Sequence, residues 1–163
     1  LYAVTVPFTG GNTRFANAAA IYEALPERIR TRLDGLEAEN AYEYSATTQM
    51  VGEGEEVASQ VHPMVIRHPV TGVPSLFVSP LMTRRVVGVS EEESQQLLGE
   101  LRLVLERDEF VYEHHWQVGD LVLWDNRCVL HARTDFDPAE ARILRRVSLA
   151  GQGAPQAYAL SAR

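Results

Sequence analysis

The polar residues best suited to chemistry lie in the last third of the chain. They are a Trp124-Asp125-Asn126-Arg127 turn, then His131, then Arg142, Arg145 and Arg146. Alternation along a strand places Arg142 and Arg146 on one face and Arg145 on the other. Two guanidinium groups on one face repel each other unless an anion lies between them, and arginine binds a carboxylate through two parallel hydrogen bonds. This spacing is typical of a site for a small dianion.

The same arginines could instead form ion pairs at the protein surface. Acidic partners are close in the sequence, at Asp135, Asp137 and Glu140. Surface ion pairs are common and contribute little to stability. Spacing alone favours this interpretation over ligand binding, and both stay open at this point.

No histidine predicts a metal site by itself. His131 follows an apolar strand segment, where a single histidine is more often structural than a ligand. His114 and His115 are adjacent, so on a strand they point to opposite faces and cannot both reach one ion. His62 and His68 are each followed by a proline, which is typical of strand ends.

Composition narrows the class of protein. The chain has 163 residues, enough for one domain, and 45% hydrophobic and 23% charged residues, as in an ordinary globular protein. Its net charge of −7 argues against nucleic-acid or anionic membrane partners. No apolar run is long enough for a membrane span. Cys128 is the single cysteine, which excludes an intrachain disulfide and fits a cytoplasmic, reducing location.

The first part of the chain predicts extended segments followed by short helices. Asn17 can cap a helix that runs through Leu25, and Pro26 suits the first position of a second helix. The glycines Gly10 and Gly11 predict a turn between the extended segments. The expected elements are strands at 1–7 and 13–15, a helix at 17–25, and a second helix with Ile29, Leu33 and Leu36 facing inward.

Residues 39–60 show no hydrophobic periodicity. Gly52, Gly54 and three nearby glutamates interrupt any regular pattern. We therefore predict a long loop over 39–60, of the kind that covers a binding site as a lid.

The rest of the chain predicts one long helix among short strands. Ser90 and Glu93 form a capping box, and leucines follow at helical spacing up to Arg107. The turns between the last strands are too short for crossover connections, so the sheet is expected to be antiparallel. The predicted class is mainly β with flanking helices (α+β). The expected strands are 61–67, 75–78, 110–116, 121–124, 128–132 and 143–149.

Several of these motifs together resemble the taurine dioxygenase family (TauD/TfdA) of Fe(II)- and 2-oxoglutarate-dependent dioxygenases. They are Gly10-Gly11-Asn12-Thr13, the segment 119–127, His131, and Arg142 with Arg146. The likeness extends over nearly the whole chain, although Asn12 stands where aspartate is more usual. The resemblance implies a double-stranded β-helix, or jelly roll. It implies that residues 1–163 are the C-terminal portion of one such domain, without its N-terminal strands.

The resemblance also implies roles for individual residues. The family binds Fe(II), O2 and the cosubstrate 2-oxoglutarate, and holds the iron with a His-x-Asp motif and a distal histidine. By that match His131 is the distal iron ligand. Arg146 would bind the far carboxylate of 2-oxoglutarate with help from the Thr13 hydroxyl. Arg142 would lie near the anionic group of the primary substrate or share the cosubstrate's carboxylate.

The turn before His131 is expected to support the metal ligand. By the resemblance Trp124, Asp125 and Asn126 shape the turn that presents His131. A role in turn formation and core packing alone is an equal alternative for these three residues.

The chain departs from the family pattern in one important respect, because His-x-Asp is absent. The five histidines are followed two residues later by Met64, Val70, Trp116, Gln117 and Arg133. In the family this motif precedes the strand that corresponds to Leu1. One protein ligand cannot hold iron in a defined facial geometry. The chain as given is therefore expected to be incomplete as an enzyme.

For the whole protein, the resemblance implies oxidative decarboxylation of 2-oxoglutarate coupled to hydroxylation of a small organic anion. Taurine-like sulfonates and aryloxyalkanoates such as 2,4-dichlorophenoxyacetate are the expected substrates, with a slight preference for the second class from the segment 109–131. One alternative is a non-catalytic jelly-roll protein that binds an anion through the Arg142/Arg146 face. Another is a structural subunit. Homo-oligomerisation is left open by the sequence.

Overall fold

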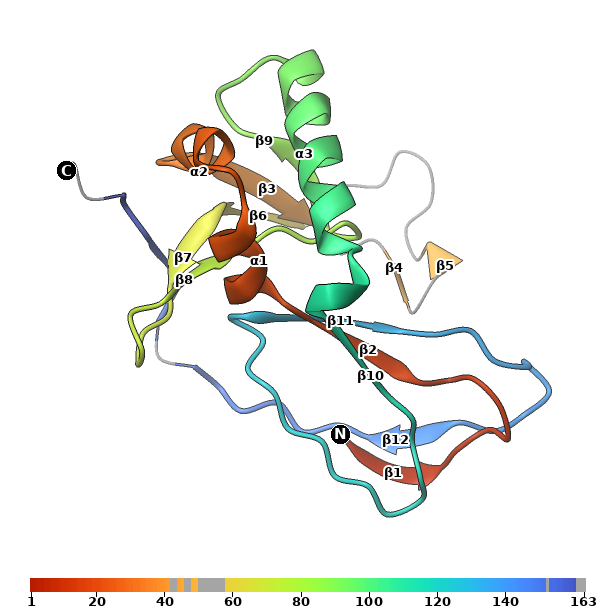
Figure 1. Cartoon of the computed structure of the whole chain (residues 1–163). Coiled ribbons are helices and arrows are strands. Elements are labelled where there is room, and N and C mark those ends of the chain that lie inside the picture. The colour runs from red at the N-terminus through yellow and green to blue at the C-terminus, as the bar shows by residue number, and fades with distance from the viewer. Residues whose placement is uncertain (42–43, 46–47, 50–57, 152, 161–163) are drawn as a thin grey trace.

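The computed structural model describes residues 1–41, 44–45, 48–49, 58–151 and 153–160. In Figure 1 the helices lie in the upper half of the view among the strands of residues 37–41, 59–67, 74–76 and 83–86, and strands and loops form the lower half. The helices are α1 (Ala18–Ala24), α2 (Glu27–Leu33) and α3 (Glu91–Leu105), with a short 3-10 turn η1 (Asp108–Phe110). The strands are β1 (Tyr2–Thr5), β2 (Thr13–Asn17), β3 (Glu37–Ala41), β4 (Tyr44–Ser45), β5 (Thr48–Gln49), β6 (Ser59–Pro63), β7 (Val65–Arg67), β8 (Pro74–Leu76), β9 (Thr83–Val86), β10 (Val111–His114), β11 (Val129–Arg133), β12 (Ile143–Arg145) and β13 (Gln156–Ala157).

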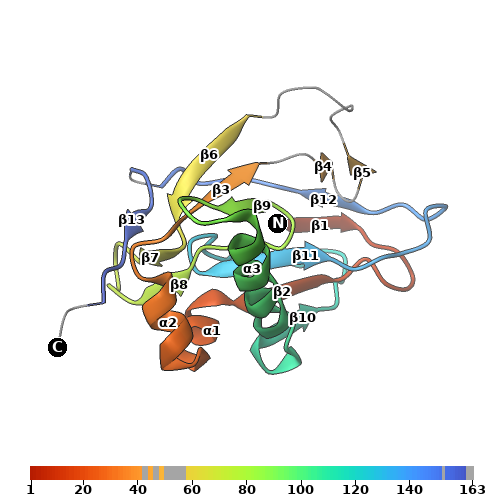
Figure 2. The same cartoon turned by 90° about the horizontal axis from the view of Figure 1, so that it is seen from above.

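The strands form several small sheets. Their orders are β1-β12, β10-β2-β11, β13-β7-β8, β6-β3-β9 and β4-β5. Every strand pair within the described residues is antiparallel, as predicted. The view from above shows β2 beside β10 and β11, with α3 crossing over the sheets (Figure 2). The mainly β class with flanking helices is confirmed.

Side-chain caps start the helices where the sequence predicts. The Asn17 side chain accepts a hydrogen bond from the backbone N–H of Ala20 at 3.0 Å. The Ser90 hydroxyl oxygen accepts a hydrogen bond from the backbone N–H of Glu93 at 3.2 Å. Three glutamates in the first turn of α3 interact favourably with the positive end of the helix dipole. Pro26 was expected to be the first residue of α2. It is instead the N-cap, and the helix begins at Glu27. No helix among the described residues is long and apolar enough to cross a membrane.

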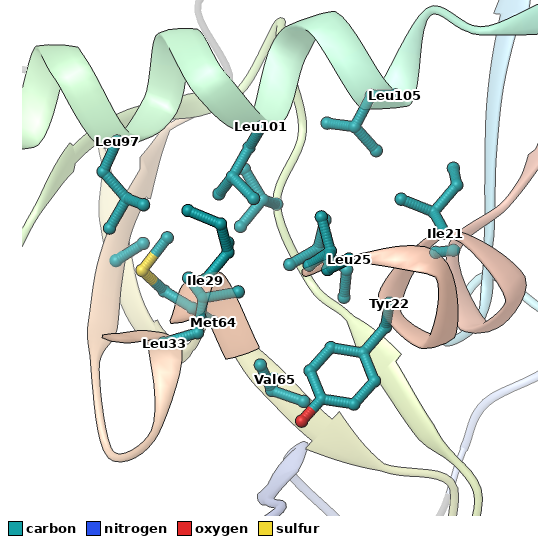
Figure 3. Packing of buried hydrophobic residues seen from close by; sticks show 14 of the residues in the cluster. Ile21, Tyr22, Leu25, Ile29, Leu33, Met64, Val65, Leu97, Leu101 and Leu105 are labelled. Atoms are coloured by element: carbon teal, nitrogen blue, oxygen red, sulfur yellow. The ribbon is translucent and has the colours of Figure 1, made fainter. Parts of the chain in front are cut away.

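The main hydrophobic core lies beneath α3. Leu97, Leu101 and Leu105 recur every fourth residue, so they share one face of the helix and are almost fully buried. Figure 3 shows this row packed over the apolar faces of the other two helices. Removing a leucine side chain from water contributes about 1.5–3 kcal/mol. The other labelled members of the cluster are Ile21, Tyr22, Leu25, Ile29, Leu33, Met64 and Val65.

Part of the predicted loop over 39–60 is strand, and that part of the prediction is wrong. The segment 39–41 belongs to β3, and β4, β5 and the start of β6 also fall in this range. β3 pairs with β6 on one side and β9 on the other, while its buried residues are the alanines Ala38 and Ala41. Alanine contributes little to a hydrophobic pattern, so the sequence gives no clear strand signal here. The segment is a strand because it pairs with a neighbouring strand on each edge. Residues 42–43, 46–47 and 50–57 lie outside the described residues, so the lid stays a prediction.

The predicted strand at 121–124 is also wrong. Only Leu121 forms an isolated bridge, to Tyr2, and Leu123 is exposed. Backbone hydrogen bonds join Gly119 and Asp120 to Ala3, and Val122 to Leu1, so the segment runs beside β1 only as far as Val122. The predicted strand at 143–149 ends at Arg145. The short strands β9 and β13 were not predicted, and each is fixed by a partner far away in the sequence.

Replacing Leu101 by alanine should lower the free energy of unfolding by about 2–5 kcal/mol, because it leaves a cavity under α3. Leu103→Ala is the matched control, since Leu103 lies on the same helix and is 74% exposed. It should change stability by less than about 0.5 kcal/mol. Urea unfolding of the two variants measures the difference. Equal losses would show that α3 does not pack through the Leu97–Leu101–Leu105 face.

Candidate functional site

The register of the sheet β10-β2-β11 brings polar and aromatic residues to one face. Thr13 pairs with Arg133, and Phe15 pairs with His131. Residues two apart on a strand share a face, so all four side chains belong to the same side of the sheet. Thr13 is 3% exposed and Phe15 is 8% exposed, whereas His131 and Arg133 on the neighbouring strand are exposed. This side is therefore covered over β2 and open to solvent over the end of β11.

Thr13 joins two elements that are distant in the sequence. The indole N–H of Trp116 donates to the Thr13 hydroxyl oxygen at 2.9 Å. Nη2 of Arg142 lies 3.5 Å from the same oxygen, and Nε of Arg142 donates to the backbone carbonyl of Gly11 at 2.7 Å. A hydroxyl offers two acceptor positions and one proton. Since Trp116 and Arg142 occupy the acceptor positions, the proton of Thr13 is left to donate to an anion.

The two glycines before Thr13 allow this close approach. Gly10 and Gly11 both have positive φ angles, of 71° and 64°. A Cβ on Gly10 would lie 2.2 Å from the carbonyl oxygen of Asp135. A Cβ on Gly11 would lie 2.7 Å from Pro7 and 3.1 Å from Cδ of Arg142. The glycine pair is therefore required both by backbone conformation and by the space that Arg142 occupies.

The Arg142 guanidinium is partly buried beside another cation. Burial lowers the pKa of Arg142 from its usual value, and the positive charge of Arg133 lowers it further. The group stays charged, since arginine does not lose its proton in proteins. A desolvated cation with a cationic neighbour is stabilised by an anion at this position.

The predicted surface ion pairs of the arginines are not formed in the described part of the chain. None of the ion pairs found there includes Arg142, Arg145 or Arg146. Two of the acidic candidates instead accept backbone N–H groups, Asp137 at 2.9 Å and Glu140 at 2.8 Å. The surface alternative therefore loses the partners on which it depended.

His131 lies in an aromatic cluster. Its ring centroid is 4.8 Å from that of Trp124 and 6.4 Å from that of Phe15. Partial desolvation beside these rings lowers the pKa of His131 although the residue is exposed on its other side, and the positive charge of Arg146 lowers it further. The neutral imidazole, which is the form that binds metals, is thereby favoured. Within the described residues the ring nitrogens of His131 have no hydrogen-bond partner, so a lone pair is available to a ligand.

The turn before β11 is held by its own side chains. The indole N–H of Trp124 donates to the side-chain oxygen of Asn126 at 2.7 Å. Asp125 accepts the backbone N–H of Arg127 at 2.9 Å, and both its oxygens accept from the guanidinium. These hydrogen bonds from Arg127 hold the pKa of the Asp125 carboxyl well below its usual range, with a further contribution from His68. The turn thus holds the Trp124 ring against His131.

The structure brings together some of the predicted residues in an unexpected pairing. Thr13 was expected to assist Arg146, and it lies instead against Arg142. Arg146 follows β12 and is exposed, and its charge acts on His131. Arg145 is exposed and pairs with Tyr2 in the β1-β12 ladder.

Sequence reasoning missed three residues that build this site. Phe15 and Trp116 complete the surroundings of His131 and Thr13, and His68 contacts the turn through Asp125. The i, i+2 spacing of Thr13 and Phe15 on one strand was a usable signal for the first. The positions of Trp116 and His68 depend on contacts between distant segments, for which the sequence carries no local signal.

Comparison with known proteins places the chain in a family. Residues 1–148 match the model described as "Taurine catabolism dioxygenase TauD, TfdA family". This chain belongs to that family. It is 37% identical to pentalenolactone F synthase of Streptomyces arenae, over 90% of this chain and 54% of that protein. It is 38% identical to the alpha-ketoglutarate-dependent 2,4-dichlorophenoxyacetate dioxygenase of Cupriavidus pinatubonensis, over 91% of this chain and 53% of that protein.

Solved structures of relatives support the same fold. AAD-2, in complex with Mn(II) and N-oxalylglycine, is 32% identical and superposes with a TM-score of 0.77, over 88% of this chain and 58% of that one. A taurine dioxygenase from Burkholderia xenovorans is 34% identical with a TM-score of 0.74, over 86% of this chain and 47% of that one. The fold is thus part of the TauD/TfdA jelly roll. The chain spans about half the length of the relatives that it matches.

Asp125→Asn should destabilise the protein by about 1–3 kcal/mol at pH 7, because it removes the charge that Arg127 binds. About a third of the Asp125 side chain is exposed, which favours the lower end of this range. The folded-state pKa lies below the unfolded value of about 3.9, so the contribution is fully present above roughly pH 5. It shrinks as the pH falls towards the folded-state pKa. Urea unfolding of both proteins from pH 7 to pH 3 measures this, and a difference that does not shrink would contradict the assignment.

Proposed function

We propose that the whole protein is an Fe(II)- and 2-oxoglutarate-dependent dioxygenase that hydroxylates a small organic anion. The observation that carries this proposal is the Thr13–Arg142 pair. It presents a desolvated guanidinium and a free hydroxyl proton on the same side of the sheet as His131, without a carboxylate partner among the described residues. We propose that a dicarboxylate would bind a metal on His131 at one end and Arg142 at the other. Family membership supports the same conclusion.

The far carboxylate of 2-oxoglutarate is assigned to Arg142 and Thr13. The resemblance had suggested Arg146 for this role, with Arg142 as the substrate residue or a second contact. The geometry favours Arg142, because it is the arginine that lies beside Thr13 and is partly buried. A guanidinium binds a carboxylate best where solvent does not compete. Arg146 is exposed and is then left for the anionic group of the primary substrate.

His131 fits the role of one iron ligand, and the described chain does not supply the rest of the set. Its imidazole is favoured as the neutral base and its nitrogens are unengaged. No group of three potential ligands in the described segments includes His131. The other ligands would come from a His-x-Asp motif elsewhere in the whole protein. When bound, Fe(II) would supply the activation of O2 that couples decarboxylation of 2-oxoglutarate to hydroxylation.

The substrate class is assigned from the positive charge that remains beside the metal ligand. Arg146 acts on His131 and has no acidic partner within the parts that the structure describes. Relatives are named for anionic substrates, namely 2,4-dichlorophenoxyacetate, phenoxypropionate and sulfate esters. We therefore propose a carboxylate, sulfonate or sulfate ester of modest size.

An apolar surface beside β1 and β12 supports a further layer of structure in the whole protein. Leu121, Leu123, Val147 and Leu149 are each exposed by 76–82%. Large exposed apolar patches on proteins usually mark surfaces that another element or partner covers. β1 and β12 form a sheet of only two strands, and residues 119–122 hydrogen-bond along the other side of β1. Among the described residues it is therefore the outer edge of β12 that is open to further pairing. The missing strands of the jelly roll suit this position.

The experiment uses protein extended at its N-terminus to include the predicted His-x-Asp motif. Arg142→Ala should raise the 2-oxoglutarate concentration for half-maximal turnover by about thirtyfold or more, because loss of a buried charged contact costs about 2–5 kcal/mol. Thr13→Val should raise it less, since one neutral hydrogen bond contributes about 0.5–1.5 kcal/mol. Arg146→Ala should weaken the primary substrate more than the cosubstrate. Steady-state formation of succinate measures all three.

Arg145→Ala is the matched control, since it removes the same charge from the other face of β12. It should change neither concentration dependence by more than about twofold. If Arg146→Ala raises the 2-oxoglutarate requirement and Arg142→Ala does not, the assignment is reversed. If the extended protein binds 2-oxoglutarate and never turns over, a non-catalytic anion-binding protein becomes the better account.

A further inference from the structure

Three potential metal ligands outside the site lie close together. One ligand atom from each of His68, Asp125 and Cys128 falls within 4.8 Å of the others. The cluster joins two segments that are 57 residues apart, at the β7–β8 turn and the turn before β11. Its composition resembles a metal centre, so the state of each donor decides what the cluster does.

The His68 ring already uses both nitrogens. Nδ1 faces the backbone N–H groups of Val70 at 3.3 Å and Thr71 at 3.2 Å, so it acts as an acceptor and carries no proton. The proton must then be on Nε2, which lies 3.2 Å from Oδ2 of Asp125 and donates to it. This tautomer has no free lone pair for a metal.

The other two donors are also engaged. Both carboxylate oxygens of Asp125 accept from Arg127. Burial raises the pKa of the Cys128 thiol, and the negative charge of Asp125 raises it further, so the thiolate that metals require is disfavoured. The thiol lies 3.8 Å from the backbone carbonyl oxygen of Asp125. The cluster is therefore a closed hydrogen-bond network and not an open coordination site.

We propose that His68 is a positioning residue that fixes Trp124 against His131 through Asp125. Its hydrogen bond links two separate sheets, because β7 and β8 belong to one sheet and β11 to another. The inference rests on the proposed function only in naming His131 as the residue that needs fixing. The hydrogen bond itself is a property of the chain alone.

The β7–β8 turn is a firm base for this bond. Its backbone closes on itself twice, from His68 N–H to the carbonyl of Val73 at 2.9 Å and from Gly72 N–H to the carbonyl of His68 at 2.8 Å. The side chain of His68 is only 12% exposed. The turn therefore fixes the position of Nε2, and the hydrogen bond from Nε2 in turn holds the Asp125 carboxylate in place.

Asp125 connects His68 to both the start of β11 and Trp124. Its backbone carbonyl accepts the N–H of Val129 at 3.1 Å, which begins β11 and sets the path to His131. On the other side it follows Trp124, whose ring packs on His131 and, at 5.0 Å between centroids, on Phe15. Hydrogen bonds made by a metal ligand itself typically change metal affinity by 10- to 100-fold when they are removed, and we expect the lower end here because His68 acts through Asp125 and Trp124.

Two substitutions separate the two ends of the His68 ring. His68→Asn keeps an acceptor at the δ position for the amides of Val70 and Thr71, but it is too short to reach Asp125. His68→Gln keeps an N–H donor at the ε position for Asp125 and loses the δ acceptor. His62→Asn is the control, because His62 lies on the neighbouring β6 and packs on Phe77 instead.

The measurement is the pair of tryptophan indole N–H resonances and the His131 ring resonances of the 163-residue chain, by proton–nitrogen NMR. His68→Asn should shift the Trp124 indole and the His131 ring and leave the Trp116 indole in place. His68→Gln should restore both towards the original positions, and the His62 control should change neither. If His68→Asn does not fold, Asp125→Asn interrupts the same contact from the other side and is judged by the same resonances.

Unchanged Trp124 and His131 resonances in the folded variants would overturn the proposal. So would micromolar Zn2+ binding that is lost in both Cys128→Ala and His68→Asn, since the cluster would then be a metal site. In the extended protein, His68→Asn should weaken Fe(II) binding by about tenfold and His68→Gln by less. Failure of the proposed dioxygenase activity would leave the NMR result standing, so the two ideas fail separately.

Discussion

The structure depends most on the register of β2 between β10 and β11. Side chains alternate along a strand, so a slip of one residue would turn Thr13 and Phe15 away from His131 and put their neighbours in place. Burial of Phe15, and the hydrogen bond from Trp116 to Thr13, hold this register from one side. The proposed anion-binding residue Thr13 lies on β2, and the proposed metal ligand His131 pairs with the same strand, so β2 positions both. The hydrophobic core under α3 lies beside this sheet and supplies the stability on which the polar face depends.

The electrostatics of the site follow from arginines that have no acidic partner among the described residues. Surface ion pairs occur elsewhere on the chain, yet the arginines that follow His131 form none with the described acidic residues. A partly buried guanidinium without a counter-ion costs free energy, which a bound dicarboxylate would offset. The lowered pKa values of His131 and Arg142 have the same origin, since each group is partly removed from water and lies beside an arginine. These features support the proposal that the site binds an anionic ligand.

Much of this could be predicted from local pattern, because caps, amphipathic helices and strand alternation are local features. Asn17, Ser90 and the leucines of α3 behave as their spacing predicts, and the strand that carries His131 was found. Contacts between distant segments could not be found in this way. The pairing of Thr13 with Arg142 spans 129 residues, and the sequence offers no means to choose between Arg142 and Arg146 as its partner. The segment 121–124 has the composition of a strand, but its neighbour β1 pairs mainly with β12.

The central claim is that Arg142 and Thr13 hold the cosubstrate while His131 holds the metal. The most direct test is a crystal structure of the N-terminally extended protein with Mn(II) and N-oxalylglycine, the pair found in AAD-2. The account predicts the metal on a nitrogen of His131. It also predicts that the far carboxylate of N-oxalylglycine lies within hydrogen-bonding distance of both Arg142 and the Thr13 hydroxyl, with Arg146 free. A carboxylate bound by Arg146 with Thr13 uninvolved, or a metal that does not contact His131, would contradict it.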